Sequence, residues 1–243
     1  MQKFIYTSIK YIVLVEVGMN GVQRNEIAKQ FIRIISYALK HRNDHYTNKA
    51  IEFLRRMNIY YGSIIVCNYK KEDFPLFGIA ASIGVPGFGI IFIDKSFFEN
   101  RKIPEKLKEF IIAHEIAHIA RIHVILNLLI KKLFEISTEA IVESIEKAET
   151  IAEAIVISLL SLFILFSLTI IDINVVKSQE LEADNLAIQL TGCEGALHFV
   201  KMLDTFKKQG IDVSHEAILG VPALTIEERL NNLRQHCGSF LVV

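Results

Sequence analysis

Residues 114–118 read HEIAH, and this stretch decides how the rest of the chain is interpreted. The preceding residues, 105–113, read EKLKEFIIA and have helical spacing with strong helix formers, so the motif is predicted to lie on a helix. On a helix, His114 and His118 project from one face, and both imidazoles can reach one metal ion. Glu115 lies beside the first histidine, where it can act as a base on water activated by that metal. The sequence therefore predicts most of a catalytic zinc site.

A third ligand is needed, and a nearby histidine is the first possibility. The metzincin pattern would place its third histidine where this chain has Val124 and its glycine where this chain has Arg121. His123 falls one position short, and we interpret it as a polar surface or core residue. The metzincin class is therefore excluded.

A carboxylate on a later helix is the second possibility. Residues 179–190 read QELEADNLAIQL, and the spacing of Glu180 and Asp184 puts both carboxylates on one helical face. One of them can bind zinc, and the other can accept the spare N–H of a ligating imidazole, which fixes the tautomer of that ring. Glu182 points elsewhere on such a helix, and we interpret it as a solvated residue. A solvated face also explains most carboxylate pairs, so the assignment depends on the HEIAH motif.

Together, HEIAH and ELEAD resemble the motifs of the gluzincin metalloendopeptidases that include the CAAX prenyl protease and HtpX. The pattern of that family is HExxH followed much later by ExxxD, and the likeness covers roughly residues 60–120 and 177–235. The resemblance implies Glu115 as the general base and Asp184 as the acceptor for a ligand's spare N–H. It also implies one zinc ion with three protein ligands: His114, His118 and Glu180.

The closing helix expected at 225–234 both matches and departs from the family. The resemblance implies Arg229 as a further catalytic residue. The family commonly has His-Pro ahead of that arginine, whereas this chain has Val221 and Pro222, one residue further from Arg229. A histidine that stabilises the transition state is therefore not carried over, and His215 is an alternative that no spacing requires.

The resemblance implies an α+β, mainly helical fold with a zincin-like core and a small antiparallel sheet before the HExxH helix. Residues 58–68 are β-branched and aromatic, which predicts a strand. Residues 78–83 and 89–93 flank the turn sequence GVPG at 84–87, which predicts a hairpin. The strand near 80–83 could pair with an extended substrate. Apolar spacing and the resemblance predict further helices at 26–39, 48–57, 195–208 and 225–234.

Composition limits the partners of the protein. The 27 basic and 27 acidic residues give zero net charge, which argues against a nucleic-acid partner. A hydrophobic content of 51% and a mean hydropathy of +0.36 point toward a membrane. Cys67, Cys193 and Cys237 are odd in number and widely spaced, so we expect no disulfide framework and a reducing compartment. No secretory signal peptide is recognised, and residues 11–15 are interpreted as a core strand or short helix.

We expect a single metallopeptidase domain over 1–243 with a helical insertion at 121–177. Within the insertion, 154–171 has no charged residue and is just long enough for a transmembrane helix. His118 precedes this segment and Glu180 follows it, so a single crossing would separate the zinc ligands across the bilayer. The zinc site therefore requires an even number of crossings, or none.

The rest of the insertion offers no second complete span. Residues 122–130 are apolar but too short to cross a membrane, and 135–153 carry glutamates at helical spacing, which indicates a solvated face. We therefore predict an antiparallel helical hairpin. Its apolar arm, 154–171, inserts into a membrane or packs against a second copy of the chain.

These expectations combine into one predicted function. The protein is expected to be a zinc-dependent metalloendopeptidase that acts on protein or peptide substrates in membrane-associated quality control or processing. We expect it at the cell membrane with its active site on the cytoplasmic side, or alternatively in the cytoplasm. Two other functions are considered. One is an ImmA/IrrE-type regulator protease, in which the two motifs lie closer together, and the other is a catalytically inert, membrane-anchored binding module.

Overall fold

The computed structural model describes residues 21–59, 62–70, 72, 79–85, 88–210, 215–216 and 222–238. The segment expected at 11–15, the turn residues 86–87 and Val221 lie outside the described residues, as does the side chain of His215.

A three-stranded sheet lies beside the helix that carries HEIAH. Its strands are β1 (Ser63–Tyr69), β2 (Ala80–Val85) and β3 (Phe88–Asp94), in the order β1-β3-β2. β2 and β3 pair antiparallel, as a hairpin requires, whereas β1 and β3 pair parallel. The expectation of an antiparallel sheet is therefore wrong for β1, and the sheet is mixed. The physical reason is the strand order. β2 lies at the edge of the sheet and runs opposite to β3, whereas β3 lies in the centre, next to β1, and runs in the same direction as β1.

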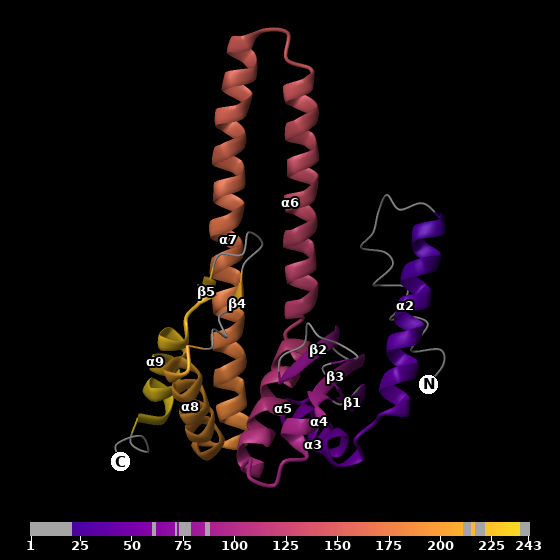
Figure 1. Ribbon diagram of the computed structural model, residues 1–243, viewed down its shortest axis with the longest axis vertical. Coiled ribbons are helices and arrows are strands. Elements are labelled where there is room, and N and C mark those ends of the chain that lie inside the picture. The colour runs from indigo at the N-terminus through magenta and orange to yellow at the C-terminus, as the bar shows by residue number, and fades with distance from the viewer. Residues whose placement is uncertain are drawn as a thin grey trace.

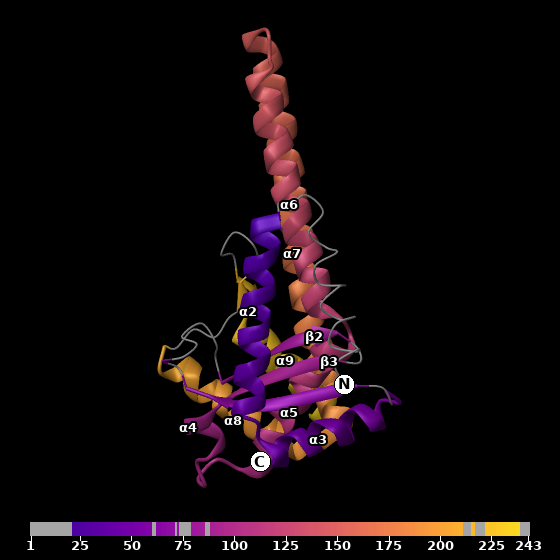
Figure 2. The same cartoon turned by 90° about the vertical axis from the view of Figure 1, so that its right-hand side faces the viewer.

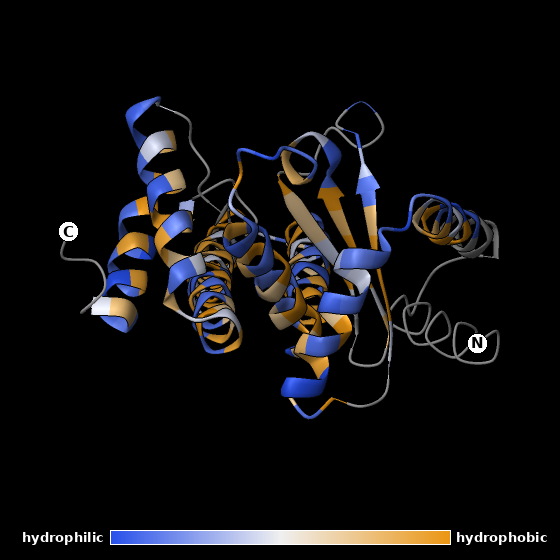
Figure 3. Ribbon diagram, turned by 90° about the horizontal axis from the view of Figure 1, so that it is seen from below, coloured by the Kyte–Doolittle hydropathy of each residue, from blue (hydrophilic) through white to orange (hydrophobic). Residues whose placement is uncertain are grey.

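Helices cover both faces of this sheet. On one face, α3 (Asp44–Arg56) and α5 (Glu105–Ala120) pack against Val66 and Ile91 in the larger core cluster. On the other face, α2 (Gly21–Lys40) packs against side chains that include Ile65 and Ile90. Because successive strand residues point to opposite faces, adjacent residues of β1 and β3 enter different cores. Figure 3 shows the apolar strands with amphipathic helices on either side, and the short α4 (Lys95–Phe98) links β3 toward α5.

The C-terminal helices form a second layer beyond α5 (Figure 1). They are α7 (Ile151–Thr191), α8 (Cys193–Lys208) and α9 (Ile226–Cys237), with the short strands β4 (His215–Glu216) and β5 (Pro222–Leu224) between α8 and α9. α8 approaches α5 closely at Gly195, where a Cβ atom would lie 2.6 Å from the carbonyl oxygen of Lys106. Helix α5 is consequently enclosed by the sheet on one side and by α7 and α8 on the other.

A long helical hairpin projects from this core, formed by α6 (His123–Glu146) and the N-terminal part of α7 (Figures 1 and 2). α6 is one continuous helix across the stretch in which the sequence suggested an apolar part and an acidic part. Thr150 caps the start of α7 by accepting a hydrogen bond from the backbone N–H of Glu153. The structure therefore has a helical excursion between the two metal-binding motifs.

Small polar residues, rather than large apolar ones, are buried along the arm part of α7. Ser161 and Thr169 are buried there. Leu162, Phe163 and Phe166 instead expose 65–70% of their surfaces. Small residues between helices and large apolar residues outside are typical of helices packed in a membrane. Of the described helices, α7 is the one that is long and apolar enough to span a bilayer by length and composition.

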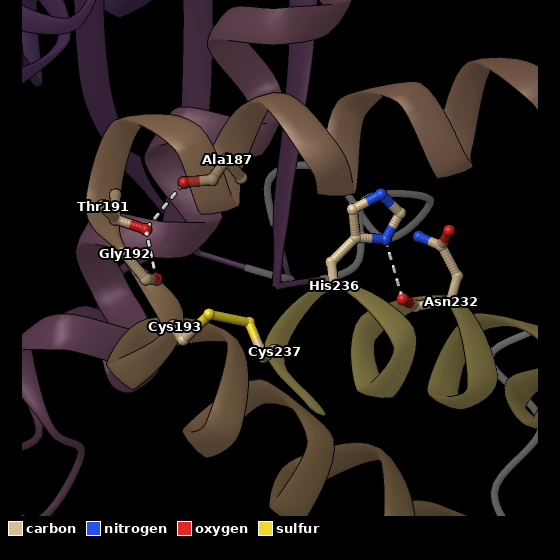
Figure 4. The surroundings of a disulfide bond; sticks show 7 residues. All are labelled: Ala187, Thr191, Gly192, Cys193, Asn232, His236 and Cys237. Atoms are coloured by element: carbon tan, nitrogen blue, oxygen red, sulfur yellow. Dashed lines mark hydrogen bonds between the residues drawn. A yellow bond between two sulfur atoms is a disulfide. The ribbon is translucent and has the colours of Figure 1, made fainter. Parts of the chain in front are cut away.

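A disulfide joins Cys193 at the start of α8 to Cys237 at the end of α9 (Figure 4). The expectation that the cysteines are unpaired is therefore wrong for these two residues, and Cys67 alone is a free, buried thiol. Their separation of 44 residues hid the pairing, because α8 and α9 pack together and bring the two Cα atoms to 5.6 Å. The argument from cysteine count to a reducing compartment no longer holds.

Candidate metal centre

The HEIAH helix, α5, places its two histidines at a buried position between the sheet and α7. Residues around almost the whole circumference of α5 are buried, which is expected for a helix enclosed by other elements. The rings of His114 and His118 lie on the same face of α5, with their centroids 4.7 Å apart. Their Nε2 atoms are separated by 3.0 Å and point to a common place.

Glu180 on α7 completes a group of three donors. Its Oε2 lies 3.3 Å from Nε2 of His114, and its Oε1 lies 3.3 Å from Nε2 of His118. Ligand atoms about 2.0–2.2 Å from a tetrahedral metal ion stand roughly 3.3–3.6 Å from one another. One donor atom from each of the three side chains lies within 4.8 Å of the other two, and two imidazoles with a carboxylate suit a divalent metal. His114, His118 and Glu180 therefore fit a single metal ion and could hold one.

Asp184, one turn further along α7, contacts the other nitrogen of the first histidine. Its Oδ1 lies 2.9 Å from Nδ1 of His114, and its side chain is fully buried. Arg229 on α9 binds the same carboxylate in a bidentate pair, with Nε 2.7 Å from Oδ2 and a terminal nitrogen 2.8 Å from Oδ1. The guanidinium also lies over the ring of Phe199, 4.7 Å from its centroid. Arg229 also approaches two candidate ligands directly, with a terminal nitrogen 3.3 Å from Nδ1 of His114 and 3.7 Å from Oε2 of Glu180.

His123 and Glu182 also lie beside this site, and the burial of His123 agrees with the core alternative of its interpretation from sequence. Nδ1 of His123 lies 2.9 Å from Nδ1 of His118, and its Nε2 lies 3.4 Å from Oε2 of Glu182. His123 is therefore buried against a candidate ligand, and Glu182 is a half-buried partner rather than a solvated residue. The reason is local: Ile122 adopts a left-handed conformation with φ 54°, so the chain turns between α5 and α6 and carries His123 back over His118.

With the geometry in view, the comparison with known families is decisive. The family model of peptidase family M48 matches residues 84–234, which include the three candidate ligands together with Glu115, Asp184 and Arg229. The chain belongs to peptidase family M48. This is the family of the CAAX prenyl protease and of HtpX-type metallopeptidases, so the resemblance seen in the motifs is confirmed. No match was found among curated proteins or among solved structures.

Membership of M48 implies a metallopeptidase that acts on peptides or proteins. It removes the ImmA/IrrE-type regulator protease as an alternative. The matched segment begins within β2 and ends within α9, so it also includes the helical arm between the two motifs.

The two candidate histidine ligands of this M48 site differ in their protonation. Burial disfavours the charged form of His114, but hydrogen bonds to Asp184 and Glu180 outweigh burial and raise its pKa to about 9. Burial instead lowers the pKa of His118 to about 3, because the opposing charge of Glu180 is not sufficient. For Asp184, burial acts to raise the pKa, and the charge and hydrogen bonds of Arg229 hold the pKa below its usual value.

Glu115 is buried beside these groups on α5. Burial raises its pKa, while the charge on His114 and a hydrogen bond from the side chain of Ser82 oppose that shift. Ser82 belongs to β2, so the carboxylate next to the metal-binding cluster touches the edge strand of the sheet. A carboxyl group with a raised pKa is suited to both accepting and donating a proton near neutral pH.

Proposed function

We propose that this M48 protein is a zinc-dependent, membrane-associated endopeptidase in which Glu115 is the general base. The observation that carries the proposal is the convergence of His114, His118 and Glu180, each of which offers one donor atom within 4.8 Å of the other two. Two histidines and one glutamate form one of the ligand sets found in catalytic zinc sites, and they leave a further position open. This ligand set supports zinc over magnesium or calcium, which prefer oxygen ligands.

The chemistry divides between the metal and the side chains around it. A bound metal supplies a Lewis acid that activates water and polarises the scissile carbonyl group. Glu115 accepts the proton of the attacking water and returns it to the nitrogen of the leaving amine. Ser82 holds the carboxylate of Glu115 in place through its hydrogen bond. Burial of Glu115 assists the second transfer, because it raises the pKa of the carboxyl group and so favours the protonated form that gives up its proton.

Asp184 and Arg229 act on the ligands rather than on the substrate. The carboxylate of Asp184 accepts the Nδ1–H of His114, which leaves the lone pair of Nε2 available for the metal. Arg229 fixes both oxygens of Asp184 through its bidentate pair. We therefore assign Arg229 a positioning role, in place of the direct catalytic role that the family resemblance implied.

The edge of β2 offers a place for an extended substrate. In the described sheet, β3 occupies one side of β2 and no described strand pairs with the other. A peptide added along that side would form main-chain hydrogen bonds, and Ser82 in the same strand would place the peptide near Glu115. Main-chain recognition requires an unfolded segment and little side-chain specificity. This mode of binding supports a role in protein quality control or processing.

The arm supports association with a membrane. Its α7 segment, 154–171, exposes large apolar side chains and buries small polar ones, and a lone crossing is excluded by the metal centre. His118 at one root of the arm and Glu180 at the other lie within 3.3 Å, so both roots are on one side of the bilayer. We propose that the hairpin enters and leaves the membrane from the side that holds the site.

We keep the cytoplasmic side as the predicted location of the site on the absence of a recognised signal peptide alone, because the Cys193–Cys237 disulfide removes the cysteine argument. A labelling experiment can test it. Cysteines introduced at Ala120 and Ser178, near the two roots of the arm, should react from the cytoplasmic side of sealed vesicles with a membrane-impermeant maleimide. Reaction from the opposite side would reverse the orientation. Reaction of the two positions from different sides would contradict the metal centre itself.

Metal analysis combined with proteolysis tests the proposed activity. The purified protein should contain about one zinc ion per chain and cleave an unfolded protein such as casein. Glu115→Gln should keep the metal and lose cleavage, because the ligands are spared, whereas His118→Ala should lose both. Glu146→Gln, at the exposed end of α6, is the matched control. Equal cleavage by wild type and Glu115→Gln would refute the mechanism.

A catalytically inert binding module is the second candidate function. The observation in its favour is the absence of the family's His-Pro ahead of Arg229, where this chain has Val221 and Pro222. Zinc bound at one ion per chain together with no cleavage of any unfolded substrate would support this function instead.

A further inference from the structure

The second ring nitrogen of His118 has a partner that nothing in the metal-binding motifs assigns. Its Nε2 faces His114 and Glu180, so its Nδ1 points away from the candidate metal position. At that side, Nδ1 of His123 lies 2.9 Å away, which is hydrogen-bonding distance. A histidine that binds a metal almost always uses its other nitrogen for such a contact, and the usual partner is a carboxylate, a carbonyl or water.

The atoms around these two rings define where each proton lies. If Nε2 of His118 binds the metal, the neutral ring carries its proton on Nδ1 and donates it. Nδ1 of His123 must then accept, so His123 carries its own proton on Nε2, which faces Oε2 of Glu182 at 3.4 Å. Glu182 accepts this hydrogen bond through Oε2 and forms an ion pair through Oε1 with Nε of Arg121 at 2.9 Å. The hydrogen bonds between His118 and His123 and between His123 and Glu182 each have one donor and one acceptor. No single nitrogen atom has to act as both donor and acceptor.

We propose that His123 is a positioning residue that holds His118 in its metal-binding tautomer, with Glu182 and Arg121 fixing His123 in turn. This assignment rests on the proposed metal centre. In the usual arrangement a carboxylate contacts the second nitrogen of the ligating histidine, whereas here the imidazole of His123 lies between His118 and the carboxylate of Glu182. His123 is not itself a ligand, because its two nitrogens face His118 and Glu182 and neither joins the donor cluster.

The fold supplies this arrangement from three elements. Arg121 ends α5, His123 begins α6, and Glu182 lies on α7 between the carboxylates that face the first histidine. The left-handed residue Ile122 separates the first two. The side chain of His123 is only 5% exposed, whereas those of Glu182 and Arg121 are 42% and 51% exposed. The contacts of His123 with His118 and with Glu182, and the ion pair of Glu182 with Arg121, therefore connect the buried metal position to the protein surface.

Two substitutions at His123 separate positioning from packing. His123→Leu fills the space but offers no acceptor, and His123→Asn places an oxygen near the position of Nδ1. We expect His123→Leu to weaken zinc binding about 10- to 100-fold in competition with a chelator, and His123→Asn to recover most of that loss. His236→Leu, a histidine at the exposed end of α9, is the matched control and should bind zinc as wild type does.

A spectroscopic measurement tests the contact itself without depending on zinc. In metal-free protein labelled with ¹⁵N histidine, Nδ1 of His118 should show a coupling across the hydrogen bond to Nδ1 of His123. That coupling should disappear in both His123 variants and persist in His236→Leu. Glu182→Gln, at a half-exposed position, should keep the coupling and shift the resonance of His123 Nε2.

The outcomes distinguish this proposal from the proposed function. If wild type shows the coupling but binds no zinc, the zinc-dependent function is refuted. The hydrogen bond between His118 and His123 is then supported, but its role in positioning a zinc ligand is refuted. If wild type binds zinc but shows no coupling, the positioning role is refuted. Zinc affinity equal to wild type in His123→Leu would refute it as well, as would equal weakening in His123→Leu and His123→Asn.

Discussion

Removal of Arg229 should reveal how strongly the second helical layer depends on one buried ion pair. Arg229 is 7% exposed and Asp184 is fully buried, so neither charge is solvated in the folded protein. In Arg229→Met, the carboxylate of Asp184 loses both bidentate hydrogen bonds and keeps only the contact with His114. Breaking a buried pair by removing one partner typically costs about 3–5 kcal/mol, because the remaining charge is left uncompensated. We expect a loss of stability in that range.

The pH dependence of this loss has a definite sign. In wild type, Arg229 holds the folded-state pKa of Asp184 below its unfolded value of about 3.9, so the pair's contribution is present above that pH and is lost on acidification. In Arg229→Met, burial is opposed only by the charge and hydrogen bond of His114, so we expect the folded-state pKa of Asp184 to rise above its unfolded value. The variant's stability then falls as the pH rises from about 4 toward the raised pKa. The difference in stability between the two proteins should therefore be smallest at the most acidic pH, below the folded-state pKa of wild-type Asp184, and should grow through pH 4 to its largest value near neutral pH.

The free thiol of Cys67 provides the assay. Cys67 is fully buried in β1, and burial raises its thiol pKa to about 12, so the folded protein should resist alkylation. Unfolding of metal-free protein in denaturant can be followed at several pH values by pulsed labelling of this thiol with a pyridyl disulfide, which reacts with thiols at acidic pH, where alkylation is too slow. Arg229→Met combined with Asp184→Asn is the control, because removing the stranded charge should recover much of the loss. A loss below about 1 kcal/mol, or one that does not change between pH 4 and 7, would refute the reasoning.

Three further predictions follow from separate parts of the molecule. Zinc binding at pH 7.5 should release about one proton, because the metal must displace it from His114, whose pKa is raised to about 9; calorimetry in two buffers of different ionisation enthalpy measures this release. Replacing Cys193 and Cys237 by serine should cost about 4 kcal/mol on the chain-entropy model for a 44-residue separation, and Cys67 labelling would report it. Phe163→Lys, at a 70% exposed site on the arm, should weaken binding to phospholipid vesicles by at least tenfold, whereas Glu146→Gln should not; unchanged flotation would argue against insertion.

The parts of the site that could be predicted from sequence are those fixed within one helix. HEIAH and ELEAD each place two side chains one turn apart, and helix geometry alone brings each pair to one face. The family resemblance then supplied the information that the two faces meet, which no local pattern contains. The same resemblance pointed to Arg229, and the structure adds that its guanidinium contacts Asp184 and His114 in the site.

The features that sequence reasoning missed all depend on how separate elements pack. His123 has the wrong spacing for the face of α5, and only the left-handed turn at Ile122 returns it to His118. The parallel pairing of β1 depends on which strand takes the centre of the sheet. The sequence of β3, FGIIFID, did contain a signal for a central position in the sheet. Its apolar residues do not alternate with polar ones, as is typical of a strand that is covered on both faces. The disulfide likewise depends on the packing of α8 against α9.

The single helix α7 connects the proposed membrane arm to the metal centre. Its apolar segment ends at residue 171, and Glu180 follows within the same uninterrupted helix. At 1.5 Å per residue, this places the candidate ligand about 14 Å beyond the end of the apolar segment. An arm inserted to that depth holds the centre within the thickness of the lipid headgroups and the water next to them. A substrate that pairs with β2 would therefore be cleaved close to the membrane surface, where the extended ends of membrane proteins are found.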